Sequence, residues 1–425
     1  MAEVERCLWH GNPSGISRKD RQPCEYHVYI PDNLVSRTFS LEGGVSADVV
    51  DAESALVRFN TEASSLVNTE ALARILLRAE SIASSKIEGL VIGARRILHA
   101  EVENSIHGST SDVTAIEVLA NIQAMVYGIE QIEEGKPITQ ELILSIHKRL
   151  LAGTKLSRYG GKLREEQNWI GGSDFNPCSA NYVPPPWELV EGLIEDLTAF
   201  CNSDALPAVA QAAIAHAQFE TIHPFIDGNG RIGRILIQLI LRRRGLATRV
   251  SPPISLILAT WAKDYVSGLT ATRYIGDHFS VEAVEGVNVW IGRFAAACSR
   301  SVKDAMEFEA HAQKIENDWR SRLKTVRKGS STDLLLQKLV GAPVLTVKSA
   351  SALTGTTLVA TNMAIARLEE AGILHQVSIG ARNRAFEAPE IIEAFSDLER
   401  QLASPEGDTR KSRPTRNVPV RINKN

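Results

Sequence analysis

Apolar residues recur at helical spacing over most of the chain. In the segment 69–90 they fall three or four positions apart, which is the period of one helix face, and Gly89 is suited to end that helix. The same period predicts further helices, and Thr139 is a suitable cap for the second of them. These lie at 116–132, 140–151, 187–201, 208–221, 231–244 and about 261–320. We therefore predict a mainly helical protein.

Three regions break this periodicity. Residues 1–50 are rich in Gly, Pro and polar groups, which predicts an irregular arm with a short extended piece at EYHVYIP. Between 159 and 186, paired glycines and closing prolines favour a hairpin or flap followed by an extended loop. From residue 336, two short helices precede two short strands that turn at 380–383, which is the order of a winged helix.

Composition places the chain among globular proteins of two or three domains. Of its 425 residues, 44% are hydrophobic and 23% are charged, and the formal net charge is -3. This balance gives no overall attraction to nucleic acid or to an anionic membrane. The N-terminus lacks a basic start followed by an apolar core, and no uncharged apolar run approaches the ~20 residues of a membrane span. We expect neither secretion nor membrane insertion.

The cysteines give a further expectation about the cellular compartment. They are scattered, odd in number and without a C-x-x-C pair: Cys7, Cys24, Cys178, Cys201 and Cys298. This pattern argues against a disulfide framework and against a structural zinc site. We expect a protein of the reducing cytoplasm.

The segment ETIHPFIDGNGRIGRILIQLIL, residues 220–241, concentrates candidate chemistry between two helical patterns. Gly228, Gly230 and Gly233 satisfy the G-x-G-x-x-G dinucleotide fingerprint literally. That fingerprint requires a preceding strand, but the residues before it, AVAQAAIAHAQFETI, are alanine-rich with helical spacing. In addition, no acidic residue ends a strand about 20 positions later. We therefore reject a dinucleotide site.

The same residues suit a phosphate site at the start of a helix. Unpaired backbone N–H groups and the positive end of the helix dipole attract an anion there, and glycines let the backbone approach it. Arg231 and Arg234 are three positions apart and share one helical face. Asp227 is a hard oxygen ligand suited to magnesium, and His223 can act as a base near pH 7. The alternative is an ordinary solvated turn between two helices.

The combination resembles the signature of the Fic family. The match covers His223, Pro224, Phe225, Asp227, Gly228, Asn229, Gly230, Arg231 and Arg234. In that family a helical core transfers AMP from ATP to a hydroxyl of a target protein. The resemblance implies that His223 is the general base, that Asp227 holds Mg²⁺ on the phosphates and that Phe225 anchors the loop. The ATP-binding residues would be Gly228, Asn229 and Gly230 at the α-phosphate and Arg231 and Arg234 at the outer phosphates.

The segment GGKLREEQNWIGG resembles the family's flap, a hairpin whose edge aligns an extended target segment by main-chain pairing. The implied docking residues are Lys162, Leu163, Arg164, Trp169 and Ile170. Without the signature, an ordinary surface hairpin would be the preferred interpretation.

The segment SSKIEG resembles the family's inhibitory motif, with Ser84, Glu88 and Gly89 at its fixed positions. The resemblance implies that Glu88 pairs with Arg234 and displaces the γ-phosphate, with Ser84 in support. Such a short pattern also occurs by chance, and Glu88 would then be a solvated side chain near a helix end. In some family members the same glutamate helps to remove AMP, so the reverse reaction stays open.

The C-terminal winged helix raises DNA as a partner, beside protein recognition and domain packing. Across 340–390 basic and acidic side chains balance, which gives little attraction to phosphates. The competing function is a transcription regulator whose core senses nucleotide, although such a sensor has no need of His223. A homodimer stays open as well.

These assignments divide the chain into five parts. They are an N-terminal arm and inhibitory-helix region at 1–110, a Fic core at 111–300, a helical linker at 301–335, a winged-helix domain at 336–400 and a disordered basic tail at 401–425. The predicted fold is all-α: a Fic-type helical core with a small β-hairpin flap, followed by the winged helix.

Overall fold

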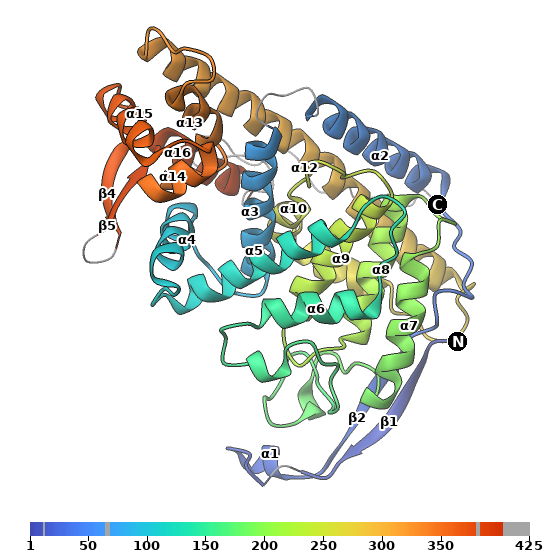
Figure 1. Ribbon diagram of the computed structural model, residues 1–425. Coiled ribbons are helices and arrows are strands. Elements are labelled where there is room, and N and C mark those ends of the chain that lie inside the picture. Colours follow the sequence, from blue (N-terminus) through green and yellow to red (C-terminus); the bar gives the residue numbers. More distant parts are fainter. Residues whose placement is uncertain (12, 64–68, 380–382, 403–425) are drawn as a thin grey trace. The chain divides into compact units, whose positions relative to one another are not determined.

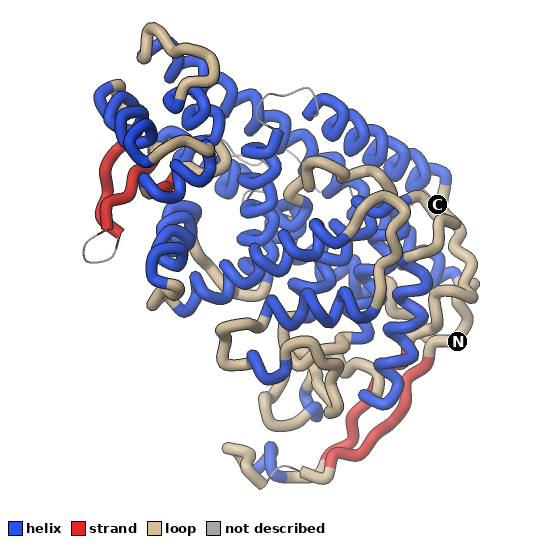
Figure 2. Tube along the Cα trace, in the orientation of Figure 1, coloured by secondary structure: helices blue, strands red, loops and turns tan. Residues whose placement is uncertain are grey.

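The computed structural model describes residues 1–11, 13–63, 69–379 and 383–402. The chain forms two compact units. Unit 1 comprises Met1–Asp51, Tyr127–Gly245 and Lys263–Ala295, and unit 2 comprises Ala52–Val126, Leu246–Ala262 and the residues from Ala296 onward. Of the expected disordered tail at 401–425, the part from residue 403 onward lies outside the described residues. Helices dominate both units, which confirms the predicted helical class (Figure 2).

The elements of unit 1 include one antiparallel strand pair and the helices that carry the signature (Figure 1). They are β1 (Glu3–Trp9), α1 (Arg18–Arg21), β2 (Cys24–Ile30), α6 (Gln140–Leu150), η1 (Ser157–Tyr159), η2 (Pro177–Ser179), η3 (Trp187–Leu189), α7 (Val190–Cys201), α8 (Ala208–Ile222), α9 (Asn229–Arg243) and nearly all of α11 (Ala262–Ala271). Besides α11, three helices have residues in both units, namely α2 (Gly43–Ala63), α5 (Val113–Gln131) and α12 (Val281–Arg322).

The centre of unit 1 is the helical hairpin of α8 and α9, which pack along each other (Figure 1). Every residue of α8 is buried, because its sequence is alanine-rich and apolar on all sides. Trp290 of α12 is also buried, and its indole N–H donates to the carbonyl of Ala213 in α8 at 2.7 Å. The small side chains of α8 therefore let neighbouring helices approach it closely.

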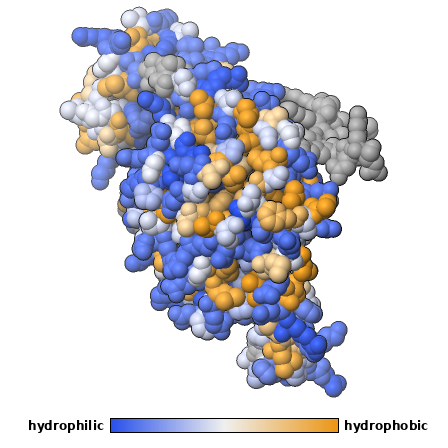
Figure 3. Space-filling model, turned by 90° about the vertical axis from the view of Figure 1, so that its right-hand side faces the viewer, coloured by the Kyte–Doolittle hydropathy of each residue, from blue (hydrophilic) through white to orange (hydrophobic). Residues whose placement is uncertain are grey.

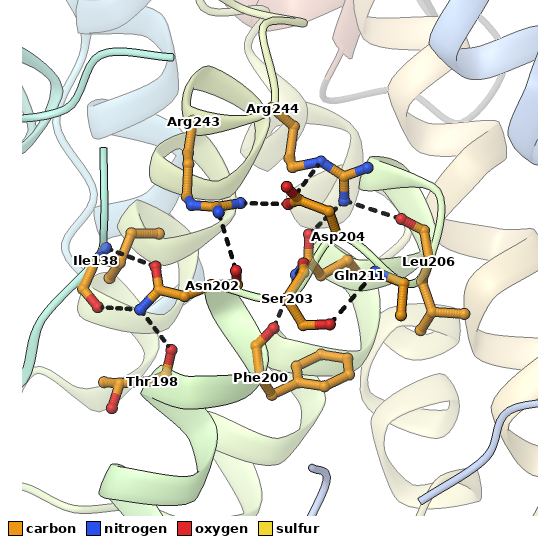
Figure 4. Close-up of polar contacts among 11 residues, drawn as sticks. Ile138, Thr198, Phe200, Asn202, Ser203, Asp204, Leu206, Gln211, Arg243 and Arg244 are labelled. Carbon is orange, nitrogen blue, oxygen red and sulfur yellow. Dashed lines mark hydrogen bonds and ion pairs between the residues drawn. The ribbon is translucent and has the colours of Figure 1, made fainter. Parts of the chain in front are cut away.

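The far end of this hairpin is held by a polar network (Figure 4). Arg243, at the end of α9, donates to the carboxylate of Asp204 at 2.7 Å and to the carbonyl of Asn202 at 2.9 Å. The side-chain amide of Asn202 donates to the carbonyl of Ile138 at 2.8 Å, and its oxygen accepts from Ile138 N–H at 2.8 Å. Arg244 donates to the side chain of Gln211 at 2.8 Å. These contacts fix the α7–α8 loop and the C-terminal end of α9, so the opposite end of the hairpin has a rigid base.

The first 30 residues correct two expectations. The predicted irregular arm contains the antiparallel pair β1–β2, of which only the extended piece at β2 was anticipated. Cys24 and Cys178 form a disulfide, with Cα atoms 5.9 Å apart, so the expectation of no disulfide was wrong. Because 154 positions separate the two cysteines in sequence, their spacing gave no sign of the pairing. The argument from cysteines for a reducing cytoplasm therefore fails.

The predicted flap is less regular than a hairpin. Over 160–186, all of which are described, the pairing consists of isolated bridges between Ile170 and Tyr182 and between Ser173 and Asn176. The N-terminal segment packs against this part: Asp20 accepts from Ser173 Oγ at 2.6 Å. The segment is thus held by side chains of the first 30 residues as well as by its own main chain.

Unit 2 contains further helices and a second sheet (Figure 2). Its elements are α3 (Thr69–Ile87), α4 (Ala94–His107), α10 (Ile254–Thr260), α13 (Ser331–Leu339), β3 (Val344–Leu345), α14 (Val347–Thr354), α15 (Leu358–Glu370), β4 (His375–Ile379), β5 (Asn383–Glu387) and α16 (Pro389–Leu402). The sheet is antiparallel in the order β3-β5-β4. This order of α13 to β5 is compatible with the predicted winged helix, while α4, α10 and α16 were not anticipated.

The surface has no continuous apolar belt on the face that Figure 3 shows, where hydrophobic groups are separated by hydrophilic ones. Within the described part of the chain, we find no helix with the length and apolar character needed to cross a membrane.

Candidate active site

The loop between α8 and α9 begins with a strained residue, His223. It caps α8 with φ 50° and ψ 59°, in the left-handed region, and its N–H donates to the carbonyl of Phe219 at 2.9 Å. This conformation costs a non-glycine residue about 1–2 kcal/mol, and such strain is concentrated at functional sites. Pro224 follows and cannot continue the helix. The sequence therefore ends α8 at the histidine and turns the chain there.

Two residues of the predicted flap hold this loop. The side-chain Nε of Arg164 donates to the carbonyl of His223 at 3.0 Å, and its main-chain N–H donates to the carbonyl of Pro224 at 2.9 Å. Asn168 Nδ2 donates to the carbonyls of His223 and Phe225, at 3.3 and 3.0 Å. These hydrogen bonds hold the main chain from His223 to Phe225.

Arg164 was expected to dock a target, but the structure places it in the interior. Its exposed fraction is 2%, and burial lowers its pKa to about 10. The guanidinium also donates to the carbonyls of Glu166 at 3.1 Å and Pro185 at 2.5 Å. It therefore anchors the loop and does not offer its side chain to a docked segment.

Phe225 and Asn229 close the loop upon itself. Asn229 Oδ1 accepts from Phe225 N–H at 2.8 Å, and Asn229 Nδ2 donates to the carbonyl of Phe225 at 2.8 Å. The ring of Phe225 is fully buried and lies 6.0 Å from the ring of Phe219. Phe225 thus anchors the loop as expected, whereas both polar atoms of Asn229 are used inside the loop.

Gly228 caps the N-terminus of α9 in a conformation that glycine adopts readily, with φ 82°. A Cβ atom at this position would lie 2.7 Å from Leu150 Cδ2. The next residues, Asn229 and Gly230, are buried in the first turn of α9, where helix N–H groups lack intrahelical partners. Backbone N–H groups and the helix dipole therefore favour an anion at this end of α9.

Two buried arginines add positive charge to the same turn. Arg231 is 3% exposed, and its Nη2 donates to the carboxylate of Asp227 at 2.8 Å. Its Nε and Nη1 atoms are buried and have no hydrogen-bond partner among the described residues. Arg234 is 1% exposed and donates to the hydroxyl of Tyr265 at 3.3 Å. Buried cationic donors of this kind are suited to phosphate oxygens.

A polar cluster behind the arginines was not anticipated from sequence. Tyr265 of α11 and His216 of α8 are 2.8 Å apart, hydroxyl to Nε2. Burial, and secondly the charge of Arg234, lowers the pKa of His216 to about 3. A neutral His216 therefore lies beneath the cationic turn, and Tyr265 joins the two.

Asp227 fits the role expected for a magnesium ligand. Its side chain is 42% exposed, at the edge of the cationic turn. Magnesium on a nucleotide commonly uses one or two protein carboxylates, with phosphates and water as its other ligands. Among the described residues there is no group of three or more His, Cys, Asp or Glu arranged to hold a metal. The exposed carboxylate of Asp227 is thus suited to share a magnesium ion with nucleotide phosphates.

His147 of α6 also belongs to this site and was missed. Its Nε2 lies 3.1 Å from the carbonyl of Asp227, and its ring stacks on Phe225 with centroids 3.7 Å apart. Burial lowers its pKa to about 4. A histidine at a buried position of an amphipathic helix gives no sequence signal of a distant partner, because 80 positions separate it from Asp227.

The other predicted flap residues surround this site in varied environments. Lys162 is exposed and Leu163 is half-buried. Trp169 donates from its indole N–H to the carbonyl of Ser173 at 2.7 Å. Ile170 is 40% exposed and forms the bridge to Tyr182. Their role in docking remains a prediction.

The predicted inhibitory residues lie in unit 2, at the end of α3. Ser84 is fully buried. The helix ends at Ile87, and Gly89 has φ 83°, which agrees with the predicted stop. Glu88 lies in the closing turn, where its N–H donates to the carbonyl of Ser85 at 3.1 Å. The pairing of Glu88 with Arg234 stays a prediction.

Two regions of the chain match known family models. Residues 137–241 match the Fic/DOC family, and residues 46–130 match the Fic/DOC family N-terminal region. Over these residues, the chain is similar to the Fic/DOC family. The first match contains the whole His223–Arg234 loop, and the second contains α3 with Ser84 and Glu88.

The chain also has curated relatives. It is 35% identical over 155 residues to the protein adenylyltransferase fic-1 of Caenorhabditis briggsae, a match that covers 34% of this chain and 28% of the relative. It is 32% identical over 192 residues to the protein adenylyltransferase Fic of Drosophila willistoni, covering 44% of this chain and 33% of the relative. The chain thus spans about a third of the length of these relatives.

A solved structure shares the Fic fold. The crystal structure of a Fic family protein from Desulfovibrio desulfuricans G20 has a TM-score of 0.50 and 18% sequence identity, and the match covers 82% of this chain and 97% of that one. The predicted Fic-type helical fold is therefore confirmed.

Proposed function

We propose that this chain is a protein adenylyltransferase, which transfers AMP from ATP to a Ser, Thr or Tyr hydroxyl of a target protein. The observation that carries the proposal is the short loop between α8 and α9, which begins at His223 and leads directly into the cationic N-terminus of α9. The names of the relatives, protein adenylyltransferases, support the same reaction.

In the proposed reaction, His223 takes the proton of the target hydroxyl. The hydroxyl oxygen forms a bond to the α-phosphorus, and the bond from that phosphorus to the oxygen bridging to the β-phosphate breaks. Pyrophosphate leaves and AMP remains on the target. Phosphate transfer of this kind asks the protein mainly for positioning and charge stabilisation. Arg231, Arg234 and the N–H groups of α9 would supply the charge.

Asp227 would hold magnesium together with the phosphates. The ion, when bound, would neutralise charge that develops on the leaving pyrophosphate. The exposed carboxylate and its contact with Arg231 support this assignment, because both place the carboxylate at the edge of the anion site.

We further propose that Glu88 inhibits the enzyme by pairing with Arg234, supported by Ser84. A paired carboxylate would occupy the guanidinium that the γ-phosphate needs. Holding 99% of the molecules in this state requires only about 2.7 kcal/mol, which one charged hydrogen-bonded pair can provide. The pairing could act within one chain or across a homodimer.

The test is transfer of label from α-phosphate-labelled ATP, with magnesium, onto the protein itself or onto proteins of a cell lysate. We expect strong labelling with Glu88→Gly, weak labelling with the unaltered chain and none with Glu88→Gly combined with His223→Ala. Labelling that survives loss of His223 would refute its role. Absence of label from every variant would refute adenylyl transfer and favour the reverse reaction, which release of AMP from a labelled target would reveal.

A further inference from the structure

The imidazole of His147 joins two main-chain groups from separate loops. Gly161 N–H donates to Nδ1 at 3.1 Å, and Nε2 lies 3.1 Å from the carbonyl of Asp227. A nitrogen that accepts a hydrogen bond carries no proton, so the ring proton is assigned to Nε2, which donates to Asp227. Both ring nitrogens therefore have a hydrogen-bond partner. The other neutral tautomer, with its proton on Nδ1, could make neither of these two hydrogen bonds.

The orientation of this ring is fixed by packing as well. His147 is fully buried in α6, and its ring stacks on Phe225 with an interplanar angle of 18°. Phe225 is itself held by Asn229, at the start of α9. A rotation of the imidazole would therefore break two hydrogen bonds and the stack at once.

The two groups that His147 joins belong to different parts of the site. Gly161 is the second residue of the flap segment, whose Arg164 and Asn168 hold the carbonyls of His223 to Phe225. Asp227 lies on the other side of that loop, immediately before the cap of α9. The flap segment thus binds the first part of the loop, from His223 to Phe225, directly. Through His147 it also binds the last part, at Asp227.

We propose that His147 is a positioning residue for adenylyl transfer, which aligns Asp227 and the first turn of α9 with the flap. The inference rests on the proposed function and adds to it a residue outside the signature. Because His147 is fully buried, we assign it no contact with nucleotide or target. Its effect is to orient the Asp227 carbonyl, and through it the direction in which the Asp227 carboxylate meets magnesium.

The test compares three replacements in the Glu88→Gly background. His147→Gln offers an amide nitrogen near the place of Nε2 and can donate to Asp227, whereas His147→Asn offers an oxygen near the place of Nδ1 and can accept only from Gly161. His147→Ala does neither. Glu141→Gln, an exposed change on the same helix, is the control for expression and activity.

We expect kcat to fall roughly 10–100-fold in His147→Ala and His147→Asn, with partial recovery in His147→Gln, as for other groups that orient metal ligands. The magnesium concentration for half-maximal rate should rise in the two impaired variants, while KM for the target protein stays near that of the control. Equal losses in all three variants with unchanged magnesium dependence would reduce His147 to a packing residue and overturn the proposal. Full activity in His147→Ala would overturn it as well.

A second measurement needs no activity and separates this inference from the proposed function. Ring ¹⁵N shifts of the unaltered chain should show the Nε2–H tautomer of His147. Hydrogen exchange at the Gly161 amide should be slow in the unaltered chain and in His147→Asn, and fast in His147→Ala. The opposite tautomer or an unprotected Gly161 amide would refute the bridge, even if Glu88→Gly transfers no AMP. A confirmed bridge without transfer would refute the proposed function alone.

Discussion

Replacing Asn229 with alanine removes the side chain that closes the Phe225–Asn229 loop. The change breaks two hydrogen bonds of 2.8 Å to Phe225. The carbonyl of Phe225 keeps a second donor, Asn168, at 3.0 Å, so its loss is limited to about 1 kcal/mol. The N–H of Phe225 is left buried without its acceptor, which costs about 1–3 kcal/mol. We therefore expect Asn229→Ala to destabilise the loop by about 2–4 kcal/mol.

The measurement combines local and global readouts. A chain with two compact units need not unfold in one step, so a single denaturation midpoint is insufficient. Hydrogen exchange at the Phe225 amide reports the loop itself and should accelerate in Asn229→Ala. Urea denaturation should show a lower midpoint. Asn317→Ala, an exposed change on α12, serves as the control and should shift stability by no more than about 0.5 kcal/mol.

One result would refute this reasoning. If Asn229→Ala keeps the Phe225 amide protected and the denaturation midpoint unchanged, yet loses nucleotide binding, Asn229 contacts phosphate directly. The family resemblance predicted that role, whereas the hydrogen bonds assign Asn229 to the loop.

Three further predictions concern packing and pH. Gly233→Ala would place a Cβ 2.6 Å from Glu220 Oε1 and 3.0 Å from His216 Nδ1. The overpacking costs about 1–3 kcal/mol, which exceeds the gain of about 1 kcal/mol in helix propensity. The thermal unfolding temperature should therefore fall, and a rise would contradict the steric argument. The lowered pKa of His216, about 3, gives stability that is present above pH 6.5 and lost as pH falls. Between pH 6.5 and 5 the free energy of unfolding should drop by about 2 kcal/mol, and it should drop less in His216→Gln. An equal dependence of the unfolding free energy on pH in both proteins would refute the assignment. Burial raises the pKa of Glu399 to about 7, and its side chain accepts from Ala94 N–H at 3.3 Å. Its contribution to stability is therefore present below pH 4.5 and lost as pH rises through 7. In urea denaturation, Glu399→Gln should be more stable than the unaltered chain by about 1–3 kcal/mol at pH 8 and nearly equal to it at pH 5.

Local sequence pattern predicted the elements that satisfy local rules. The cap at Thr139 is confirmed by its bond to Leu142 N–H at 3.2 Å, and the alanine-rich segment before His223 is helical, which excludes the dinucleotide fold. The signature residues lie on one loop because they are neighbours in sequence. A short motif with its own turn chemistry is therefore recognisable without a structure.

Contacts between distant segments could not be predicted in the same way. Arg164 appeared as an exposed flap residue because its neighbours are polar, and only the fold brings four main-chain carbonyls around its guanidinium. His147 and Tyr265 lie on helices whose apolar spacing explains their burial without indicating a partner. The pairing of β1 with β2 depends on main-chain hydrogen bonds, and the alternation in β1 is too weak to indicate it.

The bond between Cys24 and Cys178 makes a closed covalent ring of the chain between them. The chain leaves unit 1 after Asp51 and returns at Tyr127, and both crossings lie inside that ring. A single protease cut between these points would therefore leave both fragments attached under non-reducing conditions. After a nick between Glu88 and Tyr127, the disulfide would be the covalent link between the segment that carries Ser84 and Glu88 and the catalytic loop, and reduction would break that link.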